Sequence, residues 1–343
     1  MAAGIFTDDP QSEALPDTSP TSLMAALQTS HVSAFSGTVV STLSLGLPKL
    51  PVIGSAGERS TLASLLSGSH TLQVWFDGAQ RQRVALLGPT DETDVFRNGR
   101  SVWQWTSADH NAVHLTLPAS PGAGTPLVLP SGDARSLTPP SLARTALAGL
   151  DPTTTVRVKH GRSVADRSTY ELILTPRTDD TRIGSVHIAV DGATKVPLAV
   201  QVYARGHTEA SMDVAFTSIR FTPPPKRNFS FTPPPDAKVH TMGVRQHSDG
   251  PAVSGGKPGS ASESRLRVLG SGWTRVVATH LPKAATKSVR HSSALRSLRP
   301  VAGPWGKGRL LESALLSVLV TDDGRVYAGS VMPSALFARA ATR

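Results

Sequence analysis

The 343-residue chain contains no cysteine. Disulfide bonds, thiolate metal sites and a cysteine nucleophile are therefore excluded, and so is a lipid anchor on an N-terminal cysteine of the chain as it stands. Aromatic residues are scarce at 5%, and charged residues make up only 17%. No run of about 18 apolar residues occurs, so the sequence predicts no membrane-spanning helix.

Basic residues are absent from the first 20 positions, which carry four acids instead. A secretory signal peptide needs a basic start followed by an apolar stretch, and residues 1–20 have neither. Residues 1–18 are polar in composition, and we expect them to be disordered.

The formal net charge of +10 is concentrated near the C-terminus, because residues 261–343 carry 13 Lys or Arg against 4 Asp or Glu. Such a segment favours an acidic partner: anionic lipid, an acidic protein segment or nucleic acid. The stretch Lys283–Arg299 has the charge but no aromatic residue on which bases could stack. Nucleic acid is therefore not favoured.

Alternation of apolar and polar residues predicts about ten consecutive strands. Leu72, Val74 and Phe76, for example, share one side of a strand, and Asn98-Gly99 predicts a hairpin between two such runs. The expected strands cover residues 33–45, 70–77, 82–87, 93–97, 100–105, 112–117, 153–160, 168–175, 183–190, 195–204 and 208–221.

Two helices accompany the strands. The first is expected from Ser19-Pro20 to about Ser30, and the second from Thr138-Pro139 to near Gly149. Strands that follow one another without alternating helices favour an antiparallel sheet, which curls when it is large. The sequence therefore predicts a mainly β (α+β) fold, with a strongly curved antiparallel sheet or half-open β-barrel closed by helices.

The C-terminal part has a different organisation. The repeats at 221–225 and 231–235, both Phe-Thr-Pro-Pro-Pro, are expected to leave the sheet, because proline cannot donate to a ladder. We expect a large domain over 19–242, a flexible linker over 243–264 and a small basic α+β domain over 265–343. The small domain is predicted to contain a strand over 266–279, a basic segment or helix over 283–299, a loop over 300–308, an apolar run over 310–320, a strand over 325–332 and a helix from Pro333.

Catalytic patterns are missing from the sequence. There is no GxSxG motif, and Gly270-Ser271-Gly272 is interpreted as a turn. Gly303–Arg309 lacks the spacing and the Ser or Thr of a P-loop, so it is also interpreted as a turn. His110 and His114 are four residues apart, but they lie on a predicted hairpin and not on a helix that could present both to a metal. We therefore predict no enzymatic activity, no metal and no cofactor.

The tryptophans allow two interpretations. Trp75, Trp103 and Trp105 lie in neighbouring predicted strands, and the period of two places Trp103 and Trp105 on one face. On a curved sheet they could line a cavity or fill an ordinary core, and the sequence leaves both open. Trp273 and Trp305 are expected in the core of the small domain.

Several segments together resemble a known family. After the N-terminal helix come SAFSGTVV (33–40), TLQVWFDGAQRQRV (71–84), DVFRNGRSVWQWTS (94–107), VHLTLP (113–118), VPLAVQVYA (196–204) and FSFTPPPDAKV (229–239). This order over residues 20–240 is similar to that of the LolA/LolB/RseB superfamily of bacterial lipoprotein carriers and sensors, although Asp236 stands where such chains commonly have glycine.

The resemblance implies a half-barrel whose concave side is closed by helices and binds acyl chains, without a catalytic residue. The loop from Leu47 to Ile53 would then act as a lid. The cavity residues that it implies are Leu47, Leu50, Val52, Trp75, Phe96, Trp103, Trp105, Leu142 and Leu147.

The two-domain layout is similar to that of RseB-like proteins, which regulate envelope stress by binding an anti-sigma factor outside the cytoplasm. The resemblance thus implies an extracytoplasmic protein of the cell envelope that holds a lipid, acyl chain or lipoprotein, as carrier or sensor. The alternative is a regulator whose basic C-terminal domain binds an anti-sigma protein or an anionic membrane. Because such proteins are exported, we expect a leader or anchor encoded upstream of Met1. The partner-binding residues expected on the basic segment are Lys283, Lys287, Arg290, Arg296 and Arg299.

Overall fold

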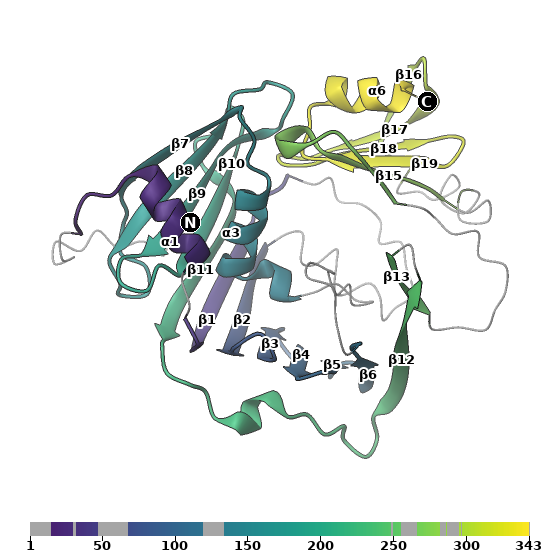
Figure 1. Cartoon of the computed structure of the whole chain (residues 1–343). Coiled ribbons are helices and arrows are strands. Elements are labelled where there is room, and N and C mark those ends of the chain that lie inside the picture. Colours follow the sequence, from purple (N-terminus) through teal and green to yellow (C-terminus); the bar gives the residue numbers. More distant parts are fainter. Residues whose placement is uncertain are drawn as a thin grey trace.

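A large curved sheet and a smaller sheet beside it make up the protein (Figure 1). The computed structural model describes residues 15–29, 32–46, 68–118, 134–247, 250–254, 266–281, 286, 295 and 297–342. None of the helices within these ranges is long and apolar enough to cross a membrane. The fold class predicted from the sequence is confirmed: the protein is mainly β, the large sheet is open, and a small C-terminal sheet carries a helix.

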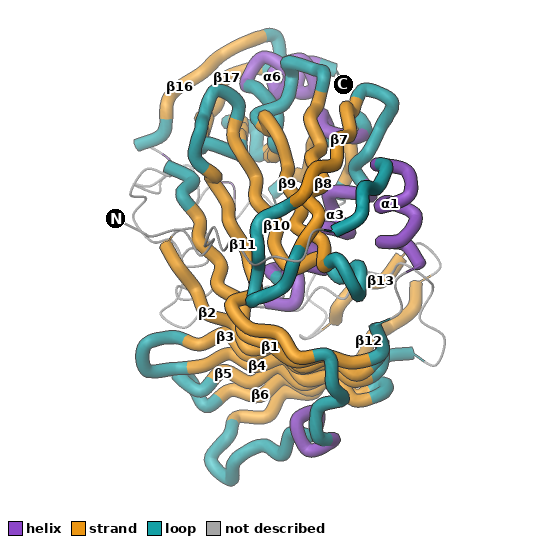
Figure 2. The backbone as a smooth tube through the Cα atoms, turned by 90° about the vertical axis from the view of Figure 1, so that its left-hand side faces the viewer, coloured by secondary structure: helices purple, strands orange, loops and turns teal. Residues whose placement is uncertain are grey.

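The large sheet has 13 strands among the described residues, in the order β13-β12-β6-β5-β4-β3-β2-β1-β11-β10-β9-β8-β7. Strands β6 and β12 run parallel, whereas the other neighbours are antiparallel. Strands β8–β11 and β2–β6 run in different directions in Figure 2, so the sheet is strongly twisted. The strands are β1 Ala34–Leu43, β2 Gly68–Asp77, β3 Arg81–Leu87, β4 Glu92–Asn98, β5 Ser101–Thr106, β6 Asn111–Thr116, β7 Thr154–His160, β8 Thr169–Pro176, β9 Ile183–Asp191, β10 Pro197–Ala204, β11 Ala210–Arg220, β12 Lys238–His247 and β13 Gly250–Ser254.

Every strand predicted between residues 33 and 221 forms, and no end is displaced by more than two residues. The hairpin at Asn98-Gly99 also forms, but with a different turn from the one that the Asn-Gly pair favours. Asn98 pairs with Ser101, so Gly99 and Arg100 are the central residues. Gly99 alone of these has a positive φ, of 61°, as a type II′ turn requires at its first central position.

Strand β1 joins the two halves of the large sheet, because it pairs with β2 on one side and with β11 on the other. A β-bulge interrupts the pairing with β11: Thr38 pairs with Ser218 and Val39 with Phe216, so Thr217 of β11 is the extra residue. Bulges bend the strand that carries them. Gly37 lies beside this bulge, where a Cβ atom would overlap the main-chain oxygen of Ser218. The bend therefore depends on a residue without a side chain.

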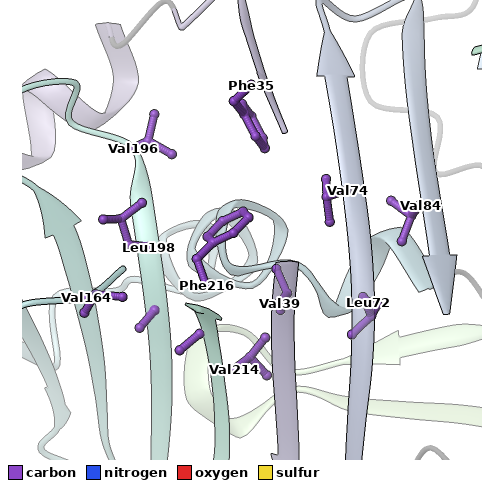
Figure 3. Packing of buried hydrophobic residues seen from close by; sticks show 12 residues of the cluster. Phe35, Val39, Leu72, Val74, Val84, Val164, Val196, Leu198, Val214 and Phe216 are labelled. Atoms are coloured by element: carbon purple, nitrogen blue, oxygen red, sulfur yellow. The ribbon is translucent and has the colours of Figure 1, made fainter. Parts of the chain in front are cut away.

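The pairing of β1 with β11 is here called the seam, and residues from both sides of it share one core. Phe216 of β11 is fully buried and packs edge-on against Phe35 of β1. Figure 3 shows Val74 and Val84 on one side of these rings and Val196 on the other. The alternation of β2 and β3 supplies the first two, and the residue just before β10 supplies the third, so the core holds the two halves of the sheet together.

The two predicted helices are α1, Pro20–Thr29, and α3, Pro139–Ala148. The N–H of Ser22 donates to Oγ of Ser19 at 3.1 Å, so Ser19 caps α1 as expected. Prolines open both helices, where their missing N–H costs nothing. Both helices lie on the concave face of the large sheet (Figure 1).

The expectation of disorder over residues 1–18 is wrong for 15–18. Leu15 packs against the core beneath α1, and the Tyr170 hydroxyl donates to the Pro16 carbonyl oxygen at 2.8 Å. Residues 1–14 lie outside the described residues. Leu15 and Pro16 therefore fix this segment to the large sheet, although its overall composition is polar.

Residues 221–237, here called the strap, leave the sheet as the proline repeats predict and cross the convex side of β3–β6 (Figure 1). The strap contains a short 3-10 helix, η2 Lys226–Phe229. It delivers the chain to β12, which pairs with β6, and β13 then pairs with β12. Residues 243–247 and 250–254, expected to belong to a flexible linker, are therefore strands of the large sheet.

The small domain is a six-stranded sheet in the order β14-β15-β19-β18-β17-β16, with a C-terminal helix. The single strand predicted over 266–279 is split by a turn in which Gly270 and Gly272 have positive φ. The loop predicted over 300–308 is a hairpin, and the run 310–320 contributes to two strands. The elements are β14 Arg267–Leu269, η3 Gly272–Thr274, β15 Val276–His280, β16 Arg299–Gly303, β17 Gly306–Glu312, β18 Ser317–Thr321, β19 Arg325–Gly329 and α6 Pro333–Ala341.

The small domain is docked against the end of β9. The N–H of Arg182 donates to the Ser330 carbonyl at 2.9 Å, and the N–H of Met332 donates to the Asp180 carbonyl at 2.8 Å. The Arg182 guanidinium also bonds Glu312 Oε1 at 2.6 Å and Ser317 Oγ at 2.7 Å. Main-chain and charged side-chain bonds together fix how the two sheets meet.

Candidate functional site: a groove on the concave face

The two helices cover the concave face through small or apolar residues. Leu23 of α1 and Ala143 of α3 are each 1% exposed. Both pack with the inward side chains of β8–β10, including Leu172, Ile188 and Val200. The alternation of apolar and polar residues along β8–β10 therefore provides the apolar surface against which the two helices pack.

A groove of about 580 Å³ lies between the helices and the neighbouring ends of β1, β2 and β3. This volume is within the range of about 300–1,000 Å³ usual for ligand sites. Its apolar walls come from both halves of the sheet and from both helices. The apolar lining residues are Leu27, Val32, Phe35, Val74, Phe76, Val84, Pro140, Ala143, Leu147, Ala148, Val196 and Pro197.

Helix α3 separates this groove from a second, smaller cavity. Pro140, Arg144 and Leu147 line the groove, and their spacing of four and three residues puts them on one face of the helix. Leu142 and Ala146, on another face, line a cavity of about 250 Å³. That cavity is bounded by the sheet and by the small domain, and its lining includes Val186, Val200, Val202, Met212 and Trp273.

Trp273 is placed differently from the prediction. It was expected in the core of the small domain, but it is 8% exposed within the cluster that lies under α1 and α3. Its indole N–H donates to Thr154 Oγ1 of β7 at 2.7 Å. The turn between β14 and β15 projects it out of its own sheet. Trp305, in contrast, is buried in the small domain's own core as predicted.

Three aromatic residues expected in the cavity lie on the opposite, convex face of the sheet. Phe96, Trp103 and Trp105 surround Phe231 of the strap, with ring centroids 5.0, 5.5 and 5.7 Å from it. Strand alternation explains this placement, since Val95 and Val102 occupy the other face. The structure therefore does not bring these three rings together with Leu142 and Leu147.

Trp75 borders the groove, but its indole lies on the convex face with these aromatics. The Arg83 guanidinium stacks between the rings of Trp75 and Phe96, 4.6 Å from each centroid. Nε of Arg83 also bonds Asp94 Oδ1 at 2.8 Å, and Asp94 is 1% exposed. The aromatic rings thus flank an ion pair between a partly exposed arginine and a buried aspartate, and these contacts link β3 to both β2 and β4.

A row of polar side chains runs across the convex face of β7–β11. Glu171 accepts bonds from Lys159 at 2.7 Å and from His187 at 2.8 Å. Burial raises the pKa of Glu171, but these bonds outweigh it and leave the pKa below its ordinary value. Further along, burial raises the pKa of Asp213, against a hydrogen bond from Gln201 at 2.9 Å. These groups face away from the groove and pair strands with one another.

The histidines singled out in the sequence are also occupied. His110 Nδ1 pairs with the Asp236 carboxylate of the strap, and His114 Nε2 bonds Ser101 Oγ at 2.8 Å. Within the described ranges, no group of three His, Cys, Asp or Glu could hold a metal ion. Residues Gly303–Arg309 form the turn and part of both strands of the β16–β17 hairpin.

No protein-family model matches the chain, and no curated protein matches it in sequence. In structure, the chain is similar to MucB from the MucA/MucB complex of Pseudomonas aeruginosa, with a TM-score of 0.45 and 16% identity over 94% of this chain and 96% of that one.

A LolA superfamily protein from Nitrosomonas europaea is also similar, with a TM-score of 0.25 and 11% identity over 63% of this chain and 99% of that one. The structural neighbours thus include the group of proteins that the sequence resembles.

The structure places the remaining predicted residues as follows. Leu147 lines the groove and Leu142 the second cavity. Arg299 begins β16, with its Nη2 3.4 Å from Glu312 Oε2. Leu47, Leu50, Val52, Lys283, Lys287, Arg290 and Arg296 lie outside the described residues.

Sequence reasoning missed several lining residues, among them Phe35, Val84 and Val196. The sequence did contain a signal for the face that lines the groove, because Leu72, Val74 and Phe76 form the more apolar side of β2, opposite Trp75. The residues implied by the resemblance were instead the large aromatic ones, and these lie on the convex face.

Proposed function

We propose that the chain is an extracytoplasmic, non-enzymatic binding protein that holds the acyl chain of a lipid or lipoprotein in the groove between α1 and α3. The observation that carries the proposal is the groove itself, about 580 Å³ in volume and walled mainly by aliphatic and aromatic side chains. The resemblance of residues 20–240 to the LolA/LolB/RseB superfamily supports the same function.

The magnitude of acyl-chain burial is sufficient for binding. A chain of 14–16 carbons gains about 10 kcal/mol gross at about 0.8 kcal/mol per buried CH₂. Loss of translational and chain entropy on binding consumes much of this gain. A micromolar Kd corresponds to about 8 kcal/mol net, so nearly the whole chain must be enclosed to reach it.

Substitution at the groove tests the proposal. Leu147→Asp puts a carboxylate on the groove wall without disturbing a fully buried position, and it should abolish uptake of a fluorescent fatty acid. The matched control is Leu266→Asp, because Leu266 is 72% exposed in the small domain. Equal uptake by the two variants would remove the groove as the binding site.

Mass spectrometry of an organic extract of the purified chain gives independent evidence. A lipid present in stoichiometric amount is expected in the wild type and absent from Leu147→Asp. An empty extract together with failure to take up the fluorescent fatty acid would overturn the proposal.

A second candidate function is protein binding by the small domain, acting as a regulator. The observation that favours it is an apolar patch on β14 and β15, where Leu266, Val268 and Val277 are 72%, 61% and 39% exposed. Val268 and Val277 are register partners on one face of the small sheet, whereas Arg267 lies on the other face of β14. Exposed apolar side chains on one face suit a protein partner with an apolar surface.

The same two variants separate the functions. In cross-linking of intact cells followed by mass spectrometry, Leu266→Asp should lose a specific partner that wild type and Leu147→Asp retain. Identical cross-links from Leu266→Asp and wild type would contradict a partner site on this patch.

A further inference from the structure

The groove carries one formal charge in its lining. Among its described lining residues, Arg144 is the single ionised side chain, and the rest are apolar or neutral polar. Arg144 is exposed and lies one helical turn from both Pro140 and Leu147 on the groove face of α3. Its position is therefore at the mouth of the groove, above the apolar walls.

Arg144 also differs from the arginines that hold the fold together. Arg83, Arg167, Arg182 and Arg205 each pair with a carboxylate, on Asp94, Asp191, Glu312 and Asp179 respectively. No hydrogen bond or ion pair engages the Arg144 side chain among the residues that the structure describes. Its five N–H donors are free to bind an oxyanion, which a guanidinium can do with two parallel bonds.

The neutral polar residues of the groove reinforce this arrangement. Gln28 of α1 and Ser141 of α3 belong to the same lining. An amide N–H and a hydroxyl can donate to the remaining oxygens of an anion held by the guanidinium. No described acidic residue lines the groove and could compete for the cation.

We propose that the groove selects amphiphiles with an anionic head group, a carboxylate or a phosphate, and that Arg144 is the residue that recognises it. The proposal rests on the proposed acyl-binding function and adds the chemistry of the head group. The chain of the ligand lies along the apolar walls, and the oxyanion lies at the mouth beside Arg144. Neutral and cationic amphiphiles of equal chain length bind more weakly, because they leave the guanidinium without a partner.

The test keeps the chain length constant and changes the head group. Hexadecanoate, hexadecyl phosphate, hexadecanol and hexadecyltrimethylammonium are compared below their critical micelle concentrations, by displacement of a neutral fluorescent probe from the full chain. Both anions should bind at least about tenfold more tightly than hexadecanol, and the preference should diminish as salt is added. Comparison of the two anions shows whether a carboxylate or a phosphate is preferred.

Substitution assigns the effect to one residue. Arg144→Gln should lower the affinity for both anions to that for hexadecanol and leave the hexadecanol affinity unchanged. Arg144→Glu should reverse the preference in favour of the cationic amphiphile. The matched control is Arg227→Gln, since Arg227 is an exposed arginine on the strap, across the sheet from the groove.

The outcomes separate the inference from the proposed function. Equal affinity for hexadecanoate and hexadecanol, or equal losses in Arg144→Gln and Arg227→Gln, overturns the role of Arg144 and leaves acyl-chain binding in place. Failure of every hexadecyl compound to displace the probe overturns the acyl-binding function itself.

Discussion

Replacement of Trp273 by alanine should release the small domain from the large sheet. Trp273 comes from the small domain, yet its indole is 8% exposed within the cluster beneath α1 and α3. Its N–H also bonds Thr154 Oγ1 at 2.7 Å. The substitution empties this position without removing a residue from the small domain's own core.

The expected magnitude follows from burial. Truncation of a buried aromatic residue to alanine costs about 3–5 kcal/mol, and the lost hydrogen bond is part of that cost at about 1 kcal/mol. A loss of this size lowers the docking equilibrium by about 100-fold to several thousand-fold, at about 1.4 kcal/mol per factor of ten. The Arg182–Glu312 ion pair is partly exposed, with side chains 15% and 34% accessible, so it cannot offset the loss.

Native-state hydrogen exchange measures the release directly, because main-chain amides, those of Arg182, Met332 and Ala314, bond across the interface. The N–H groups of Arg182 and Met332 should lose protection in Trp273→Ala. Amides of β18, inside the small sheet, should keep theirs. Trp273→Phe should retain most of the protection, since it removes the hydrogen bond but little of the buried area.

Val268→Ala serves as the control, because Val268 is 61% exposed in the same domain and should change stability by no more than about 0.5 kcal/mol. Unchanged protection of Arg182 and Met332 in Trp273→Ala would refute the view that this indole holds the two domains together.

Two further predictions concern the large sheet. Gly37→Ala should destabilise it by about 1–3 kcal/mol in urea denaturation, because the new Cβ would overlap the Ser218 oxygen at the bulge. Gly149→Ala is the control and should be tolerated, because a Cβ atom there would lie 3.4 Å from its nearest neighbour, the Ala146 oxygen. Burial raises the pKa of Asp191, but hydrogen bonds from Arg167 and Thr194 outweigh it and hold the pKa below its ordinary value. The stability that Asp191 contributes is thus complete above about pH 4 and is lost as the pH falls through the lowered pKa. Asp191→Asn should therefore lower the free energy of unfolding by about 2–3 kcal/mol at pH 7. It should also reduce the loss of stability below about pH 4. Parallel profiles of unfolding free energy against pH for variant and wild type would contradict this role of Asp191.

The strands of the large sheet were predictable because alternation is a local signal. Each hairpin from β2 to β6 and from β7 to β11 is a pair of neighbouring runs with a turn between them. The pairing of β1 with β11, and of β6 with β12, joins segments that are distant in the sequence. No local pattern encodes such pairings, so the position of the strap and the strand that follows it was not predicted.

The candidate site was harder to predict than the fold. Alternation showed that Trp103 and Trp105 share a face, but not which face the helices cover. Which face the helices cover depends on where α3 and the strap pack against the sheet. Phe231 of the strap packs against the face that carries the aromatic residues. Leu147, which the resemblance implied as a cavity residue, lines the groove, and its role in binding stays a prediction. Arg144 carries a signal that was overlooked, because it is an isolated cation on a helix with no other charged residue.

The seam between β1 and β11 also bears on the order of folding. Strands β2–β6 and β7–β11 are two runs of local hairpins, which close over short loops and form quickly. The seam instead pairs residues such as Thr38 and Ser218, so its contact order is high and it forms late. During synthesis, β1 must wait with one unpaired edge until β11 has emerged, and an unpaired edge is open to association with other chains. The step that completes the concave face is therefore also the step at which the nascent chain is most exposed to aggregation.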